Sequence, residues 1–341
     1  FFEDHMLKRF LSYYKPQMGL FVADTVCALV LAAIDLAFPI ILRNLTGGLF
    51  TQGQAAIMQA LGMIAVGLVL MYVIRCACRY FVSYWGHVMG ARMESKMRED
   101  LFDQYERFSF AYFDRNSSGD MMSRVVNDLF DICEAAHHVP EWIIICGIEI
   151  IGSFVILFTI APVLALAMAV VTAAFAVIMF WQNMRMREVF SDNRKKISGI
   201  NAQLQDSLAG MRVVKSFANE ETERSKFRAS NNRYLSSKEN MYHAMGVYTA
   251  TYGLLSGVLY VIVVLLGGWL VAQGQLQAVD MATFALYISL FCTPLETLVN
   301  SAEMYQKAIA GFKRMDEVLS TAPDIQDKLG ATDLQVTAGA V

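Results

Sequence analysis

The chain has 341 residues, a mean hydropathy of +0.41, 56% hydrophobic residues and only 17% charged residues. Soluble domains carry about a quarter charged residues, so this composition excludes an ordinary soluble protein and indicates an integral membrane protein. With a formal net charge of −3, nothing indicates a nucleic-acid partner or a basic membrane-surface protein, and we expect no nucleic-acid partner.

The N-terminal segment, residues 1–17, mixes charges with aromatic side chains such as Phe10, Tyr13 and Tyr14. Aromatic rings prefer the headgroup region of a bilayer, and amphipathic helices lie in that plane. The segment is therefore predicted to be an amphipathic elbow helix on the inner membrane surface.

Six apolar runs follow the elbow. A run of about 20 helical residues crosses the roughly 30 Å hydrocarbon core of a bilayer. The runs are predicted as membrane spans at residues 18–42, 55–85, 139–160, 163–181, 244–272 and 279–300.

The basic residues predict the orientation of these spans. With the N-terminus inside the cell, every lysine and arginine except Arg43 falls in a cytoplasmic connection or at the inner end of a span. Lysine and arginine are enriched on the cytoplasmic side of membrane proteins. We therefore expect both termini in the cytoplasm, in a multi-pass protein of the plasma (inner) membrane.

The two long cytoplasmic stretches, residues 86–136 and 182–242, keep helical spacing of apolar residues, as at Leu101, Tyr105 and Phe108. The simplest interpretation extends the flanking spans into the cytoplasm as two helical hairpins. The predicted fold is an all-α membrane protein with six transmembrane helices and two long cytoplasmic helical hairpins.

Each hairpin is expected to have one break in its helical pattern, at the tip. Residues 112–120 contain Asn, Ser and Gly, and Ser117 followed by Asp120 is typical of a helix N-cap. The second break is expected at Gly210. Both tips place aromatics beside charges, a mixture typical of a docking surface, although ordinary hairpin turns would also account for them.

The tips carry a specific resemblance. The pattern Phe113-Asp114-Arg115 with Ser118-Gly119-Asp120 resembles the first intracellular loop of ATP-binding cassette (ABC) exporters. The segment from Ser207 to Phe217 resembles the second. The family usually has Glu where this chain has Asp206, a departure that keeps the charge. The resemblance covers essentially the whole chain, including the order and lengths of the loops.

This resemblance implies that each tip is a coupling helix that grips a nucleotide-binding domain. It places the coupling role on Phe113, Arg115, Ser118, Gly119, Asp120, Gly210, Met211, Arg212 and Lys215. It also implies a dimer, with domain swapping, of two identical chains or of paired half-transporters. The chain would supply the substrate path in residues 18–310 and transmit motor closure to it.

The motor itself is not recognisable in the sequence, which contains no G-x-x-x-x-G-K-[S/T] loop. Residues 311–341 resemble the linker that leads to the motor, and Leu334–Val341 resembles the approach to its first strand. We expect no catalytic residue and no cofactor in this chain. ATP and Mg²⁺ are expected in a nucleotide-binding domain, and the complete protein is expected to be an ATP-hydrolysing translocase. That domain either follows in the same polypeptide, of which this sequence would be a truncated part, or is a separate chain.

Ionisable groups within the spans are costly in a bilayer and are candidates for function. Asp35, Glu149, Glu296 and Asn300 are predicted to line the substrate cavity. Asp24 is expected to form an ion pair with Arg75 or Arg79 near the inner membrane surface, because intramembrane charges usually pair.

Two other classes remain open at this point. An ion-driven secondary transporter would show inverted repeats, which the sequence lacks, and a membrane scaffold would use the hairpins only for docking. The substrate class (small molecule, lipid or peptide) is not predicted. No metal site is predicted either, since the only closely spaced cysteines, Cys76 and Cys78, are not at zinc-binding spacing.

Overall fold

The computed structural model describes residues 4–326 and 330, and all of the regular structure in this part of the chain is helical. Six helical stretches are long and apolar enough to cross a membrane, and the chain is a multi-pass membrane protein. These stretches are His5–Thr51, Gln54–Glu106, Ser118–Ile160, Pro162–Ala209, Glu220–Ala272 and Ala278–Ser320. Each predicted run lies within one of them.

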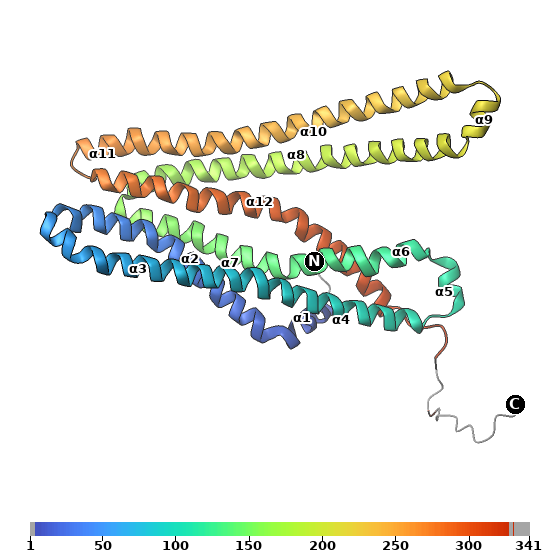
Figure 1. Ribbon diagram of the computed structural model, residues 1–341, viewed down its shortest axis with the longest axis horizontal. Helices are drawn as coiled ribbons and strands as arrows, with labels where there is room; N and C mark the ends of the chain where they lie inside the picture. Colours follow the sequence, from blue (N-terminus) through green and yellow to red (C-terminus); the bar gives the residue numbers. More distant parts are fainter. Residues whose placement is uncertain (1–3, 327–329, 331–341) are drawn as a thin grey trace. The chain divides into compact units, whose positions relative to one another are not determined.

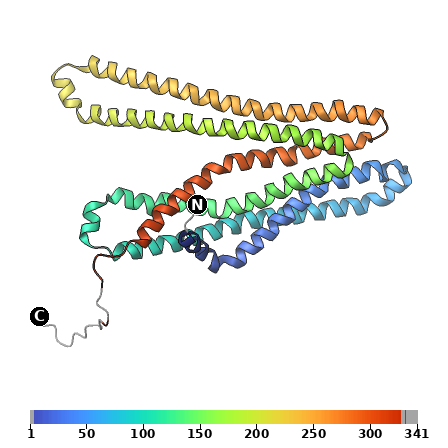
Figure 2. The same cartoon turned by 180° about the vertical axis from the view of Figure 1, so that it is seen from behind.

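Short 3₁₀ or π-helical turns divide several of these stretches into individual α-helices, which Figures 1 and 2 show from opposite sides. The α-helices are α1 (Asp4–Tyr14), α2 (Met18–Gly47), α3 (Gln54–Phe81), α4 (His87–Glu106), α5 (Phe110–Arg115), α6 (Ser118–Ser123), α7 (Leu129–Ile160), α8 (Pro162–Ala209), α9 (Met211–Ser216), α10 (Glu220–Ile262), α11 (Gly268–Ala272) and α12 (Ala278–Ser320). Single π-helical turns occupy Val82–Gly86, Arg124–Asp128 and Val263–Gly267.

The chain divides into two compact units. The first comprises Phe1–Leu31, Tyr72–Ile144 and Ser301–Val341. Its core is formed by one face of α4, where Met89, Met93, Met97 and Leu101 recur every fourth residue and are almost fully buried. Residues four apart lie on one side of a helix, so this spacing builds a continuous apolar stripe. Phe312 and Met315 of α12 belong to the same core.

The second unit comprises Ala32–Met71 and Ile145–Asn300. Its core contains Leu164 and Met168 of α8, Leu255 and Leu259 of α10, and three aromatic residues of α12. The aromatic residues are Phe284, Tyr287 and Phe291. Helices α8 and α10 run side by side along their length, and α9 lies at their far end (Figure 1).

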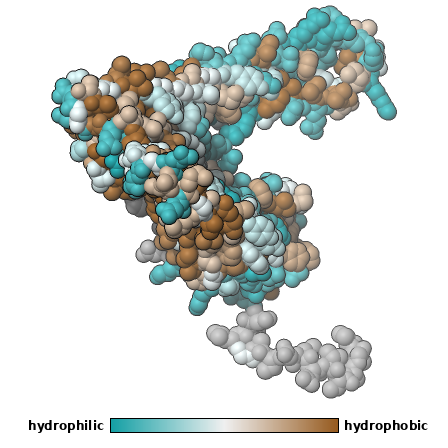
Figure 3. Space-filling view, turned by 60° about the vertical axis from the view of Figure 1, so that its left-hand side comes forward, coloured by the Kyte–Doolittle hydropathy of each residue, from teal (hydrophilic) through white to brown (hydrophobic). Residues whose placement is uncertain are grey.

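The length of α8 and α10 exceeds what a bilayer needs. Helix α8 has 48 residues, so it extends about 70 Å, more than twice the roughly 30 Å hydrocarbon core. In Figure 3 the arm formed by this hairpin is hydrophilic toward its α9 end and more hydrophobic toward the other end. The α9 end therefore has the composition of a segment that stands in water.

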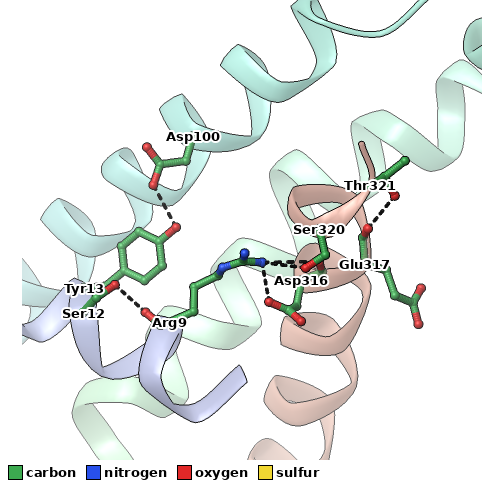
Figure 4. A network of polar contacts seen from close by, with 8 residues as sticks. All are labelled: Arg9, Ser12, Tyr13, Asp100, Asp316, Glu317, Ser320 and Thr321. Atoms are coloured by element: carbon green, nitrogen blue, oxygen red, sulfur yellow. Dashed lines mark hydrogen bonds and ion pairs between the residues drawn. The ribbon is translucent and has the colours of Figure 1, made fainter. Parts of the chain in front are cut away.

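The elbow helix α1 is fixed to the first unit by polar contacts (Figure 4). The Arg9 guanidinium donates to Asp316 Oδ1 at 2.5 Å and to Ser320 Oγ at 3.0 Å, and the Tyr13 hydroxyl donates to Asp100 Oδ2 at 2.8 Å. Burial and the neighbouring carboxylate of Asp100 raise the pKa of Tyr13, so its hydroxyl stays protonated and remains a donor.

Tyr14 satisfies a carbonyl that Pro140 leaves unpaired. In an α-helix the carbonyl of Ala136 would accept a bond from the N–H of residue 140, but proline has no N–H. The Tyr14 hydroxyl donates to that carbonyl at 2.5 Å, and the Tyr14 side chain is buried. The elbow helix thus completes the hydrogen bonding of α7.

Replacing Tyr14 with phenylalanine is therefore expected to destabilise the chain by about 1–3 kcal/mol, the usual cost of an unpaired buried polar group. Pro140→Ala restores an N–H at position 140, so the same Tyr14→Phe change should cost much less in a Pro140→Ala background. Thermal unfolding of the four proteins of this double-mutant cycle in detergent measures the coupling. Equal costs in the two backgrounds would contradict the assignment.

Candidate functional site

The tip of the first hairpin is built from two short helices, α5 and α6, between α4 and α7. The chain breaks at Arg107–Ser109 and again at Asn116–Ser117. Ser117 caps α6 as predicted: its Oγ accepts the Gly119 N–H at 3.2 Å, and Asp120 lies in the first turn. The capping oxygen and the acid both compensate the unpaired N–H groups at the start of a helix.

The predicted coupling residues of this tip all point outward. Phe113, Arg115, Ser118, Gly119 and Asp120 are exposed. Phe110, which the sequence did not single out, is 90% exposed, the largest exposure among the large hydrophobic side chains of the described residues. The tip therefore presents an exposed aromatic ring beside exposed charged side chains.

The second tip is α9, a helix of one and a half turns that joins α8 to α10. Helix α8 ends at Gly210, whose N–H donates to the Asp206 carbonyl at 2.9 Å. The chain breaks again after Ser216, and Ala218 adopts a φ of 47°, in the left-handed region. The prediction of one break for each hairpin was wrong, since two breaks bracket the short segment at each tip.

The outer side of the second tip combines charge and apolar surface. Met211, Arg212 and Lys215 are exposed, Gly210 is half-buried, and Phe217 is 78% exposed. The Lys215 ammonium donates to Glu220 Oε1 at 2.9 Å, which lowers the pKa of the Glu220 carboxyl and ties α9 to α10. A groove of about 270 Å³ beside α9 is lined in part by Leu208, Met211 and Phe227.

The four residues predicted for the substrate cavity lie in the second unit. Asp35 is half-buried on α2, Glu149 is buried on α7, Glu296 is half-buried on α12, and Asn300 is exposed on α12. Of these, Asn300 takes part in a polar network.

This network links three helices and includes residues that sequence reasoning missed. Asn183 of α8 is buried and donates to the Val299 carbonyl at 3.1 Å and to Asn300 Oδ1 at 3.3 Å. The Tyr248 hydroxyl of α10 donates to the same Asn300 oxygen at 3.2 Å. Arg187 donates to Asn183 Oδ1 at 2.9 Å.

Tyr252, one helical turn beyond Tyr248, lies within hydrogen-bonding reach of Glu296. Glu296, one turn before Asn300 on α12, thus faces a second tyrosine of α10. Asn183 lies just past the predicted end of the fourth apolar run, among Gln182 and Arg185, so no signal in the sequence indicated that its side chain is buried.

The predicted ion pair of Asp24 with Arg75 or Arg79 was wrong. Among the described residues Asp24 is buried, and its Oδ1 has no hydrogen-bond partner. The ionisable side chains near it are Glu141 and His138 of α7. The prediction rested on Asp24 and the arginines lying at a similar depth in the membrane. In the structure, however, the ionisable groups beside Asp24 are those of α7.

Comparison with known proteins decides the family. Residues 21–295 match the model of the ABC transporter transmembrane region. The chain belongs to this family. It is 32% identical over 334 residues to the Bacillus subtilis (strain 168) uncharacterized ABC transporter ATP-binding protein YwjA, covering 98% of this chain and 58% of that protein.

More distant ABC exporters match over the same region. The ATP-dependent lipid A-core flippase of Syntrophus aciditrophicus (strain SB) is 23% identical, with 96% of this chain and 54% of the flippase covered. The putative multidrug export ATP-binding/permease protein YgaD of Bacillus subtilis is 22% identical, with 98% and 58% covered. This ABC transmembrane region thus spans a little over half the length of the curated relatives it matches.

Proposed function

We propose that this chain is the membrane-spanning part of an ATP-driven exporter, and that its two hairpin tips transmit the closure of motor domains to the substrate path. The observation that carries the proposal is the same construction at both tips. Each hairpin ends in one or two short helices bracketed by breaks, with exposed aromatic and charged side chains such as Phe113, Asp120, Arg212 and Phe217. Ordered helices in water need a partner to offset their ordering entropy.

The motor partner is a nucleotide-binding domain that holds ATP and Mg²⁺, and this chain contributes no catalytic residue. Both tips and both termini lie in the cytoplasm, consistent with the distribution of lysine and arginine, and the spans cross the plasma membrane. Two chains, identical or paired, form the transporter, with exchange of hairpins between them. Long helices such as α8 and α10 are suitable levers for rigid-body alternating access.

The substrate path uses the polar groups of the second unit. Glu296 and Asn300, held by Tyr252, Tyr248 and Asn183, are the proposed contacts on α12, with Asp35 and Glu149 as further contacts. Buried polar groups within membrane helices typically mark substrate pathways. One relative is named a lipid A-core flippase and another a putative multidrug export protein. We therefore propose that the substrate of this chain is a lipid-like or drug-like molecule rather than an ion.

Charge reversal at the tips tests the coupling. In the full-length protein, Asp120→Arg or Arg212→Glu is expected to reduce transport at least about tenfold while ATP hydrolysis persists, because like charges at a docking surface cost several kcal/mol. Hydrolysis and transport are measured together in proteoliposomes, with a cargo first identified by stimulation of the ATPase. Glu239→Arg, on an exposed part of α10 away from the tip, is the control. Coupled transport at the wild-type rate in both tip variants would refute the docking role.

A further inference from the structure

Three of the five histidines in the chain gather in the first unit, at the start of α4 and in the N-terminal half of α7. His87, Glu134, His137 and His138 can each offer one ligand atom, and these atoms all lie within 4.8 Å of one another. The ring centroids of His87 and His137 are 4.6 Å apart, and those of His137 and His138 are 4.1 Å apart. The coupling function does not use this cluster.

His137 has a buried nitrogen without a partner. The side chain is only 3% exposed, and its Nδ1 lies 2.8 Å from the Cys133 carbonyl oxygen. A carbonyl only accepts hydrogen bonds, so Nδ1 carries the proton and Nε2 presents a lone pair. That Nε2 has no hydrogen-bond partner. A histidine whose one nitrogen donates to a carbonyl, with the other nitrogen free, has the arrangement of a metal ligand.

The surrounding helices make room for this arrangement. A Cβ atom at Gly90 would lie 2.9 Å from His137 Nδ1, and one at Gly86 would lie 3.3 Å from Asp24 Oδ1, so both positions favour glycine. A π-helical turn, Val82–Gly86, directly precedes His87. Such turns are rare and occur frequently at functional sites, where they redirect the side chains that follow.

The other ligands are positioned by α7. Glu134 is three residues before His137 and four before His138, so all three share one face of the helix. The ring of His138 stacks on Trp142 with centroids 4.8 Å apart, and its Nε2 lies 3.6 Å from Glu134 Oε2. Asp24 and Glu141, both near His138, add negative charge beside the cluster. The local charge therefore favours a cation.

We propose that His87, Glu134, His137 and His138 bind one divalent transition-metal ion of the Zn²⁺ class, which joins α4 to α7. Imidazole nitrogens suit Zn²⁺ and its neighbours, whereas Mg²⁺ and Ca²⁺ prefer oxygen ligands only. Donors about 2.0–2.1 Å from a tetrahedral ion lie about 3.3 Å apart, so the widest ligand separation contracts by up to about 1.5 Å on binding. The side chains of His87, Glu134 and His138 are partly or fully exposed and can make this movement.

Direct binding measurements test the site without reference to transport. The whole chain is purified in detergent with a tag that contains no histidine, stripped with a chelator, and titrated with Zn²⁺ by calorimetry. Co²⁺ serves as a second probe, because its visible absorption reports a tetrahedral nitrogen-containing site. The expected result is one ion per chain, a raised thermal midpoint with Zn²⁺, and no competition from Mg²⁺ at the same concentration.

Variants assign the ligands. His87→Ala and Glu134→Gln alter side chains that are not fully buried, so folding is expected to survive, and each should weaken Zn²⁺ binding about tenfold or more. His243→Ala and Glu239→Gln, at exposed positions on α10, are the matched controls and should leave binding unchanged. His137→Gln tests the buried ligand but could also unfold the chain, so it does not decide the outcome.

Three results would overturn the proposal. The first is the absence of saturable Zn²⁺ binding to the wild-type chain. The second is wild-type affinity in both His87→Ala and Glu134→Gln, which would make the cluster a packed stack of rings. The third is an equal loss of affinity in the His243→Ala control, which would indicate adventitious surface binding.

Discussion

Replacing Arg314 with alanine is expected to destabilise the first unit by about 2–3 kcal/mol, because it leaves a buried carboxylate without its counter-charge. Arg314 of α12 binds Asp128 with two bonds, Nε to Oδ2 at 2.7 Å and Nη2 to Oδ1 at 2.6 Å. The Asp128 side chain is only 11% exposed, whereas that of Arg314 is 45% exposed. Partial exposure of the arginine places the expected cost below that of a fully buried pair.

The pair fixes the end of α12 beside the first hairpin, where Asp128 ends a π-helical turn. The hydrogen bonds to the Asp128 carboxylate raise the pKa of Arg314 above its usual range, as expected when the charged form of the guanidinium is stabilised. Gly311 allows the approach, since a Cβ there would lie 3.2 Å from the Asp128 carbonyl oxygen. The loss of this ion pair should therefore loosen the connection between α12 and the hairpin.

A double-mutant cycle separates the pair from its parts. Thermal unfolding in detergent is measured for Arg314→Ala, Asp128→Ala and the double variant, and the double variant is expected to lose less stability than the sum of the singles. Arg233→Ala, at an exposed position on α10, should change stability by less than about 0.5 kcal/mol. Strict additivity across the cycle would show that the two side chains do not stabilise one another.

Features that depend on local sequence were predictable. The apolar runs that make the six spans are properties of single segments, and the Ser117 cap needs only Ser117 and the acid at Asp120. The second break at the α9 tip, after Ser216, was missed because the residues there give no local signal. Ala218 carries no turn signal, yet it adopts a left-handed conformation, which alanine does at a steric cost.

Features that depend on packing between distant segments were not predictable. Asn183, Tyr248 and Asn300 come from three helices, and no spacing rule brings them together. The position of Asp24 depends on which side of α2 it occupies, which the length of an apolar run does not define. The histidine cluster needs His87 of α4 to lie against α7, and Gly86 and Gly90, on either side of His87, leave the space for that approach.

The largest expected effect in the second unit belongs to Tyr287. Its side chain is completely buried in the core, and its hydroxyl donates to the Leu36 carbonyl at 2.5 Å. Leu36 lies three residues before Pro39, in a turn of α2 where the proline removes one backbone hydrogen bond and its ring crowds the preceding carbonyls. The tyrosine therefore both fills the core and joins α12 to the part of α2 that precedes Pro39.

Tyr287→Ala is expected to destabilise the chain by about 3–5 kcal/mol, because it creates a cavity in the core and removes the hydrogen bond to α2. Tyr287→Phe keeps the ring and removes only the bond, so it should cost about 1 kcal/mol. Tyr260→Ala, at a position 45% exposed on α10, is the matched control and should cost little.

The order of thermal midpoints in one detergent is the measurement: wild type and Tyr260→Ala highest, then Tyr287→Phe, then Tyr287→Ala. If Tyr287→Phe fell as far as Tyr287→Ala, the hydrogen bond to α2 would outweigh the packing of the ring. If Tyr287→Phe matched the wild type, packing alone would join α12 to α2, and the proline turn would be stable without the hydroxyl. The gap between the two variants thus gives the separate contributions of a polar contact and of aromatic packing to one helix junction.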